Sequence, residues 1–553
     1  MKNLNTRDLI TVISLSIVFF LIATLNLGFK EIPSSGLKVS GNDGFYIDLE
    51  TENNVSEIML LLKNGKINLE IFTGQPENWI GEKTISIDDY YNWKRIDINR
   101  STRYLKIDIV RSYGELLEIV VIEEGHRIEN ISVYRENGEK EPLWQLTDEQ
   151  EMAVTPITYK SETVFDEIYF VRSAEEYLSG KEPTETTHPP LGKLLIAAGI
   201  SVFGFNPFGW RIMGVIFATL MIPIIFFLGK EISSSWLGGF FSSLLLMFDF
   251  MHFTMSRIAT LDTFLVFFLL GSQLFFYKYV LDVLKTGWRV SLRPYFFAVF
   301  ILALGFSIKW TAVFSLAAQL FYLYLLKVKF TQNKSKINYG NTINSKKIIY
   351  ALSGTVVIFG IVYLLSYVPY MSLGHSLNDV YNRQWSMLNY HLKLKAIHPF
   401  SSPWWSWPML LRPMWLYESV LGEGYISTIT LMGNPAVWWI GLVSIIIVTV
   451  KAIKEKSQSY VYLVTMFIFQ WIPYAFISRS LFIYYFYPNT IILCLIISTQ
   501  ICRLWKEEKV RWKVITYLIV LLLLFGLFYP IISGNIMPVW WRDSLRWFPS
   551  WVF

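Results

Sequence analysis

The chain has 553 residues, of which 53% are hydrophobic and 17% are charged. In soluble domains, apolar residues average about 45–50% and charged residues about 25%. The mean hydropathy of this chain is +0.39. Its 21 Trp, 31 Tyr and 41 Phe exclude a disordered protein. Apolar runs near or above the ~18 residues of a membrane helix exclude a single soluble domain; they lie at 212–228, 261–277 and 515–532. The net charge of +6 is unevenly distributed, because residues 30–160 hold 24 acids and 15 bases, whereas the remainder holds 19 acids and 34 bases.

The N-terminal segment 1–30 is predicted to be a membrane anchor. Lys2 and Arg7 precede a mostly apolar run from Leu9 to Phe29. This run is too long for the apolar core of a cleaved signal peptide, and it lacks a clear cleavage site of small residues. We therefore expect a transmembrane helix whose N-terminus is cytoplasmic.

Residues 31–160 predict an antiparallel β-sandwich outside the membrane. Short runs that alternate apolar and polar residues recur between turn residues, at 44–49, 66–72, 103–109 and 116–122. With Trp79 and Trp93 upstream of the last two runs, this order resembles a galactose-binding-like (discoidin-type) jelly roll. The resemblance implies a sugar-binding domain, and a β spacer without a ligand is the alternative.

Apolar spans resume after residue 190 and, with the first helix, make eleven predicted membrane helices. Their approximate bounds are 212–228, 235–253, 261–279, 295–308, 311–326, 348–369, 435–450, 459–477, 481–501 and 514–532. Basic residues cluster in the loops that this count places in the cytoplasm, at 285–293, 327–347, 451–456 and 503–513. The acidic β domain and the outer loop 371–434 then face outward. The expected fold class is a mainly α polytopic membrane protein with an inserted all-β domain, in which residues 161–553 form the membrane domain.

Outward-facing segments at the membrane edge concentrate acids, His, Trp and Pro, where charge is costly and usually functional. Asp166 and Glu167 open one such segment, whose apolar residues recur at helical spacing. This pattern is typical of a helix that lies on the membrane surface. From this segment alone, an N-cap role for Asp166 and a first-turn role for Glu167 are the simpler interpretation.

Further motifs follow Asp166-Glu167 in a characteristic order. They are His188-Pro-Pro-Leu-Gly-Lys193, Gly209-Trp-Arg211, Ser256-Arg-Ile-Ala-Thr-Leu-Asp262, Ser307-Ile-Lys-Trp310, His398-Pro-Phe-Ser-Ser-Pro-Trp-Trp-Ser-Trp-Pro408, Met432-Gly-Asn-Pro-Ala436, and Arg479 before Tyr484-Tyr-Phe-Tyr-Pro488. Over roughly 161–490 this order closely resembles the protein O-mannosyltransferases, which are phospholipid-carrier-dependent glycosyltransferases of the GT-C class (glycosyltransferase family 39-like). The family's topology of eleven helices agrees with the predicted spans. The chain departs from the family in its β domain before the Asp-Glu motif, and the MIR domain of the eukaryotic enzymes is not evident.

The resemblance implies an inverting enzyme that moves mannose from a polyprenyl or dolichyl phosphate to Ser or Thr hydroxyls of exported proteins. Asp166 would be the general base, and Glu167 would shape the acceptor site or orient Asp166. Asp262 would orient a cation or a sugar hydroxyl, and a structural ion pair with Arg257 is the alternative. The carrier phosphate is the leaving group, so cations must hold its charge. The candidates for binding the carrier phosphate or the sugar are His188, Lys193, Arg211, Arg257, Asp262, Lys309 and Arg479.

The expected partners are the lipid-linked donor, acceptor proteins and membrane lipid, without nucleic acid. Inverting transfer needs one base and no covalent intermediate. No nucleotide takes part in it, so we expect neither a cofactor nor a metal.

Cys494 and Cys502 lie on one predicted helix, about 12 Å apart along its axis, too far for a disulfide. The expected location is a bacterial plasma membrane, with the active site outside.

Two other functions remain open at this point. One is carrier-dependent transfer of another sugar to a lipid or a cell-wall polymer, as in the aminoarabinose transferases. Those enzymes carry Lys before Pro-Pro, where this chain has His188. The other is a non-enzymatic transporter of lipid-linked sugars or a membrane-anchored lectin. A transporter is less favoured, because no pair of repeated halves is evident and the charges gather on one side.

Overall fold

A computed structural model of the protein describes residues 5–76, 78–135, 142–332, 344–395 and 398–553. Its contacts divide the chain into two units. The β unit comprises Asn26–Arg172 and Val202–Gly209. The helical unit comprises Met1–Leu25, Ser173–Ser201 and Trp210–Phe553. Each unit is described by itself below.

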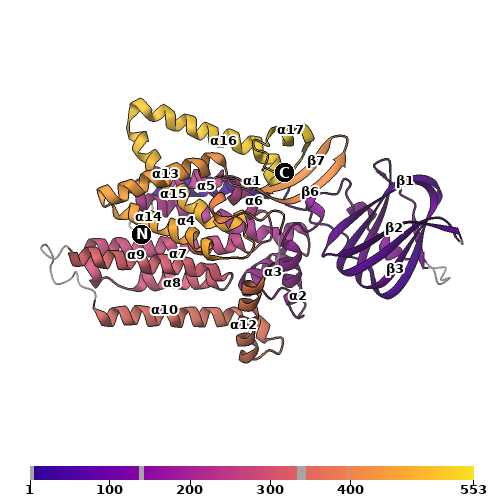
Figure 1. Cartoon of the computed structure of the whole chain (residues 1–553), viewed down its shortest axis with the longest axis horizontal. Helices are drawn as coiled ribbons and strands as arrows, with labels where there is room; N and C mark the ends of the chain where they lie inside the picture. Colours follow the sequence, from indigo (N-terminus) through magenta and orange to yellow (C-terminus); the bar gives the residue numbers. More distant parts are fainter. Residues whose placement is uncertain (1–4, 77, 136–141, 333–343, 396–397) are drawn as a thin grey trace. The chain divides into compact units, whose positions relative to one another are not determined.

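Two long strands organise the β unit. These are β1 (Leu37–Gln75) and β3 (Asn92–Glu123), joined by β2 (Asn78–Asp88), β4 (His126–Arg127) and β5 (Ser132–Arg135) in the order β2-β1-β3-β4, with β5 on β1. Residues 37–48 and 64–74 of β1 both pair with the middle of β3, over 104–116. Residues 53–62 pair instead with 92–102 on one side and 116–123 on the other. Each long strand therefore contributes to two antiparallel layers (Figure 1).

The alternating sequence pattern explains how the two layers of the β unit pack. Phe45 and Ile107 from one layer and Ile58 and Ile119 from the other are buried in one hydrophobic core. Because side chains alternate across a strand, each run sends every second residue inward. The predicted antiparallel β fold at this position is confirmed.

The two ends of the β segment meet. Phe29 donates its backbone N–H to the carbonyl oxygen of Lys160 at 2.9 Å. Beyond that point, the Glu162 carboxylate accepts the backbone N–H of Trp93 on β3 at 3.0 Å. The chain therefore enters and leaves the strands at one place, as an inserted segment requires.

The helical unit contains the membrane-crossing segments. In the described part of the chain, nine helices are long and apolar enough to cross a membrane. They are α1 (Thr6–Thr24), α4 (Pro207–Ser233), α7 (Asp262–Thr286), α9 (Val313–Gln332), α10 (Ser345–Ser366), α13 (Pro435–Glu455), α14 (Gln458–Trp471), α15 (Tyr487–Lys506) and α16 (Arg511–Ser533). A 3-10 helix continues α14 to Phe476, so this span has 19 residues. The chain is thus an integral, multi-pass membrane protein.

The two remaining predicted spans take different forms. The span 235–253 is a broken pair, α5 (Trp236–Met247) and α6 (Phe250–Ser256), bent by 61°. If the pair counts as one span, the described residues provide ten. The span 295–308 is α8 (Arg293–Phe306), whose 14 residues rise about 21 Å, less than the ~30 Å of a hydrocarbon core. The predicted count of eleven membrane spans therefore holds only if the α5–α6 pair and α8 are each counted as one span.

Packing within the helical unit places α15 at its centre. Fourteen of its 20 residues are buried, and it packs against α5, α13, α14, α16 and α7. By contrast, α10 buries three residues and packs on α8 at the edge (Figure 1). Cys494 and Cys502 on α15 are both free and buried, so the predicted absence of a disulfide is confirmed.

Asn434 stabilises the break between α5 and α6. Its side-chain oxygen caps α13 by accepting the Ala436 N–H at 2.9 Å, and its Nδ2 donates to the Phe248 carbonyl oxygen at 2.8 Å. The Asp249 carboxylate accepts the backbone N–H groups of His252 and Asn434, so it caps α6 as well. The preceding Gly433 is sterically required, since a Cβ there would lie 2.0 Å from the Trp438 ring. The Met-Gly-Asn-Pro-Ala motif is thus a joint between two membrane segments.

The described residues of the predicted outer loop, 371–395 and 398–434, contain regular structure. They include the amphipathic helix α12 (Leu377–Lys393) and the hairpin of β6 (Met414–Gly422) and β7 (Tyr425–Leu431). The short strand β8 (Ile536–Pro538), which follows α16, pairs with β7 and completes a three-stranded sheet. Shorter helices are α2 (Glu167–Leu178), α3 (Leu191–Phe203), α11 (Val368–Met371) and α17 (Val539–Ser544).

Candidate functional site

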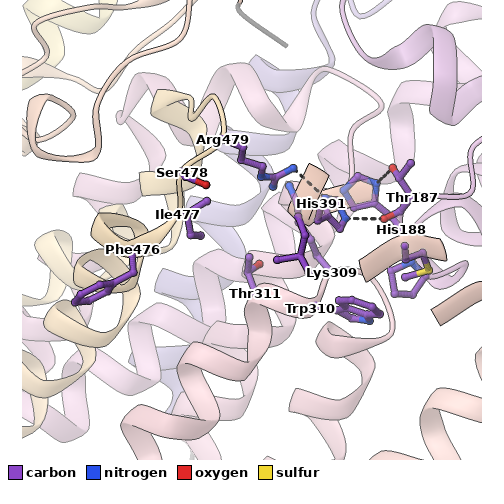
Figure 2. A pocket seen from close by; sticks show the side chains of 13 residues that line it. Thr187, His188, Lys309, Trp310, Thr311, His391, Phe476, Ile477, Ser478 and Arg479 are labelled. Carbon is purple, nitrogen blue, oxygen red and sulfur yellow. Dashed lines mark hydrogen bonds between the residues drawn. The ribbon is translucent and has the colours of Figure 1, made fainter. Parts of the chain in front are cut away.

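A cavity of about 280 Å³ in the helical unit gathers several of the predicted site residues. Four segments distant in sequence line it: the loop before α3, the turn that precedes α9, the end of α12, and the loop before α15. His188, Lys309 and Arg479 are among its lining residues (Figure 2). The structure thus brings three of the residues predicted to bind the phosphate or the sugar together, of which Lys309 and Arg479 are cations.

Lys193 holds the loop that presents His188. Its side chain is 2% exposed, and its ammonium group donates to the carbonyl oxygens of Glu185 (2.8 Å) and His188 (3.0 Å) and to Glu185 Oε2 (2.6 Å). An ammonium has three N–H donors, so all three are used. Lys193 therefore acts on this site through the loop, and its predicted direct contact with a phosphate is not supported by this arrangement.

Glu185 is the acid of this loop, and the sequence analysis did not single it out. Burial alone would raise the pKa of its carboxyl, but the adjacent Lys193 ammonium and His188 imidazole hold that pKa well below its usual range. His188 Nδ1 lies 3.1 Å from Glu185 Oε1 and 3.0 Å from Thr187 Oγ1. Burial lowers the pKa of His188, against the opposing effect of Glu185. An ionised carboxylate thus orients the imidazole, as in other His–carboxylate pairs.

Lys309, which lines the cavity, forms a buried ion pair with Asp262. Lys309 Nζ lies 2.9 Å and 3.0 Å from the two carboxylate oxygens of Asp262. The ammonium also lies 5.4 Å and 5.2 Å from the ring centroids of Tyr484 and Tyr485, within cation–π range. Asp262 therefore orients a cation, and that cation is Lys309.

The alternative pairing of Asp262 with Arg257 is wrong. Arg257 is 4% exposed, and its guanidinium donates to the carbonyl oxygens of Ala23 (2.6 Å), Leu25 (2.7 Å) and Ser533 (3.3 Å). These carbonyls lie at the C-terminal ends of α1 and α16, where helix carbonyls lack partners within the helix. Arg257 thus joins two helix ends, and it does not line the cavity in the described part of the chain.

Arg479 has a different environment from the other cations. Nη1 lies 2.9 Å from His391 Nδ1, and Nη2 donates to the Tyr485 hydroxyl at 3.2 Å. Both partners are uncharged groups. Within the described ranges, no carboxylate pairs with this guanidinium. The cavity therefore keeps a positive charge that no acid among the described residues neutralises.

His391 is a second site residue that sequence reasoning missed. It lies near the end of α12, where Nε2 is 2.9 Å from the Thr187 carbonyl oxygen and Nδ1 faces Arg479 (Figure 2). A single His on an amphipathic helix has no motif around it. Its partners are 204 and 88 residues away in the chain, so no local signal could have found it.

Arg211 lies in the first turns of α4 and is fully buried, with Cζ 5.9 Å from the Trp210 ring centroid. It is not among the cavity-lining residues of the described chain. Its predicted contact with the carrier phosphate stays a prediction.

Asp166 lies in the turn directly before α2 and Glu167 is the first residue of that helix, and both belong to the β unit. The backbone carbonyl of Asp166 accepts the N–H groups of Tyr169 and Phe170, and Glu167 Oε2 accepts the Val164 N–H at 2.9 Å. Glu167 is fully buried, whereas Asp166 is partly exposed. These contacts show how the turn is built, and the predicted catalytic roles stay predictions.

Two family descriptions match the helical part of the chain. Residues 187–345 match "Dolichyl-phosphate-mannose-protein mannosyltransferase", and residues 376–551 match "C-terminal four TMM region of protein-O-mannosyltransferase". The second range includes both His391 and Arg479.

Known proteins resemble the chain over most of its length. The polyprenol-phosphate-mannose–protein mannosyltransferase of Corynebacterium glutamicum is 27% identical over 423 residues, which are 66% of this chain and 81% of that protein. The protein of the same name from Mycobacterium tuberculosis (strain H37Rv) is 25% identical over 469 residues, 70% of this chain and 86% of that one.

A solved structure shares the fold. It is the Saccharomyces cerevisiae protein O-mannosyltransferase Pmt1-Pmt2 complex bound to the sugar donor, with a TM-score of 0.58 and 14% identity, covering 71% of this chain and 89% of that chain. Together with the family matches and the motif order, this similarity shows that the chain belongs to the protein O-mannosyltransferase family of GT-C glycosyltransferases.

Proposed function

We propose that the protein transfers mannose from a polyprenyl phosphate carrier to Ser or Thr hydroxyls of proteins. Relatives that align with 66% and 70% of this chain are named polyprenol-phosphate-mannose–protein mannosyltransferases. The structural observation that supports the proposal is the cavity at the loop before α3, with Arg479 as a cation that no described carboxylate neutralises.

A cationic cavity suits a phosphate leaving group. As the bond from mannose C1 to the phosphate oxygen breaks, negative charge accumulates on the phosphate. Arg479 can donate charge-assisted hydrogen bonds to it, which are roughly twice as strong as neutral ones. The Lys309 ammonium lines the same cavity and is held in place by Asp262. Fixed cations of this kind stabilise the developing charge without reorganising during the reaction.

The transfer reaction needs one general base, which takes the proton of the acceptor hydroxyl. The acceptor hydroxyl oxygen forms the new bond to C1, the bond from C1 to the phosphate oxygen breaks, and the hydroxyl proton passes to a carboxylate. We assign that base to Asp166, with Glu167 supporting the turn. His188 and Arg211 are further donors for the phosphate, and Lys193 acts through the loop that presents His188. Neither a cofactor nor a metal is needed to balance this step.

The test is transfer by the purified full chain in detergent. Polyprenyl-phosphate-mannose and a Ser/Thr-containing peptide are expected to yield a mannosylated peptide, and the Arg479→Ala variant is expected to need more donor for half-maximal rate. A protein that mannosylates no peptide, but transfers a sugar from the carrier to a lipid or a glycan, would overturn the protein acceptor. Failure to release any polyprenyl phosphate would overturn the enzymatic function.

A further inference from the structure

His391 connects two segments that line the cavity. Its Nε2 lies 2.9 Å from the Thr187 carbonyl oxygen, in the loop before α3. Its Nδ1 lies 2.9 Å from Nη1 of Arg479, in the loop before α15. Figure 2 shows the imidazole between these two partners. A side chain from α12 thus spans the gap between two other parts of the site.

The partners determine which nitrogen of His391 carries the proton. A carbonyl oxygen only accepts, so Nε2 must hold the hydrogen that it donates to Thr187. A guanidinium only donates, so Nδ1 must offer its lone pair to Arg479. His391 is therefore neutral, with one tautomer. Burial, the Arg479 charge and the nearby His188 agree with this, since they lower the pKa of His391 to about 4.

The contacts leave part of Arg479 available to an anion. A guanidinium has five N–H donors in a planar fork. His391 uses one on Nη1, and the Tyr485 hydroxyl uses one on Nη2. Because both partners are neutral, they fix the plane of the fork without cancelling its charge. A carboxylate in place of His391 would hold the guanidinium as well but would neutralise it.

We propose that His391 is a positioning residue of the donor site. It orients the Arg479 guanidinium toward the carrier phosphate and ties that orientation to the loop that presents His188. The inference rests on the proposed function, since it takes the phosphate of a polyprenyl carrier as the ligand of this cavity. His391 itself acts through Arg479 and is not a catalytic residue.

Binding of undecaprenyl phosphate to the full chain in detergent tests this role without requiring catalysis. His391→Ala is expected to weaken binding by about tenfold, comparable to losing one hydrogen bond of a charged group. His391→Gln is expected to recover most of the affinity, because its amide offers an oxygen to Arg479 and an N–H to the Thr187 carbonyl. The apparent KM for the peptide acceptor should be unchanged in both variants.

Coupling to Arg479 separates positioning from general packing. In an Arg479→Ala background, adding His391→Ala should cause no further loss of affinity, because the group that His391 orients is gone. His375→Ala is the matched control, since that histidine pairs with Glu182 and is not among the described lining residues of the cavity. It should bind like the parent.

Each contrary outcome is decisive. Parent-like binding by His391→Ala, equal losses in the Ala and Gln variants, or additive losses with Arg479→Ala would overturn the positioning role. An equal loss in His375→Ala would overturn it too, because the effect would not be local. If these binding results hold but no mannose is transferred to peptide, the proposed acceptor reaction fails and the role of His391 at the phosphate stands.

Discussion

At the scale of single residues, the turn before the Asp166-Glu167 pair is unusual. Phe165 has a φ of +52°, a left-handed conformation that is rare for a bulky side chain. Such a residue costs on the order of 1–3 kcal/mol and persists only where its surroundings hold it. The backbone conformation of Phe165 therefore holds the Cα of Asp166 in a defined position. Backbone strain of this kind is concentrated at functional sites.

Asp166→Asn separates a catalytic role from a capping role. Asn caps a helix about as well as Asp, so a purely structural Asp166 predicts near-normal activity. A general base predicts a loss of roughly 10²–10⁴ in turnover, because an amide cannot take the hydroxyl proton. The measurement is single-turnover mannosyl transfer, with donor affinity determined in parallel.

Donor affinity in Asp166→Asn should remain close to that of the parent. Turnover within a few-fold of the parent would contradict the assignment and leave Glu167 as the next candidate. Asp262 would be a weaker one, since both of its carboxylate oxygens already accept from Lys309.

A buried carboxyl makes the β unit sensitive to pH. Burial and, to a lesser extent, the neighbouring charges of Asp148 and Glu149 raise the pKa of Glu118 to about 8, against the hydrogen bonds from Gln150 and the Glu149 backbone. The folded state thus binds this proton more tightly than the unfolded state, whose Glu pKa is about 4.3. The stabilisation by Glu118 is complete below that value and is lost as the pH rises through about 8.

Glu118→Gln should remove this dependence, because the amide stays neutral and keeps an oxygen for the Gln150 side chain. Amide hydrogen exchange of residues 116–123 in the full chain is the measurement. Compared at equal pH, the variant should be protected better than the parent at pH 9 and equally at pH 5. Equal protection of the parent and the variant at both pH 5 and pH 9 would show that ionisation of Glu118 does not destabilise the β unit.

At the scale of elements, the joint between α5, α6 and α13 rests on one amide side chain. Asn434 is fully buried, caps α13 and satisfies the Phe248 carbonyl at the end of α5. Asn434→Ala removes a cap, which costs about 1 kcal/mol, and leaves a buried carbonyl without this donor, which costs about 1–3 kcal/mol. A lower melting temperature of the purified protein is expected, with Asn434→Ser intermediate because Ser restores only the cap. A melting temperature of Asn434→Ala equal to that of the parent would argue against the joint.

The orientation of the helices follows from the basic loops. Ser179 follows α2, and Ser457 lies between α13 and α14. Positive loops stay in the cytoplasm, so the two positions should lie on opposite faces of the membrane. A cysteine at position 179 should react with an impermeant thiol reagent added to intact cells, whereas a cysteine at position 457 should not react from that side. The natural Cys494 and Cys502 are buried and provide a low background. Labelling of both new cysteines from outside would refute the topology.

At the scale of the whole molecule, the β domain of residues 31–160, which does not include Asp166 and Glu167, is expected to be separable from the chemistry. Phe29 and Lys160 lie within one backbone hydrogen bond of each other, so a short linker can replace residues 31–160. Turnover on a short peptide should stay within about tenfold of the parent, a change of ~1.4 kcal/mol in the barrier. Complete loss of turnover, with a membrane part that still melts cooperatively, would mean that residues 31–160 help to build the active site.

Much of this architecture could be predicted from local patterns. Hydropathy over ~20 residues decides whether a segment crosses the membrane, and alternation decides which strand residues face a core. Accordingly, the predicted spans correspond to helices, and Phe45 and Ile107 lie in the core as their runs require. The order of the Asp166, His188 and Arg479 motifs along the chain also indicates the family.

Only the tertiary structure decided which of these residues meet. Lys309 pairs with Asp262 instead of standing alone, Arg257 joins two helix ends, and Lys193 is enclosed by its own loop. His391 meets partners 204 and 88 residues away, so nothing near it in the chain distinguishes it from a surface histidine. Hydropathy and alternation are set by neighbours in the chain, whereas a cation's charge in a site depends on acids that distant segments bring to it. The sequence by itself therefore determined the segments and the family, and the packing of those segments determined the positive charge of the cavity.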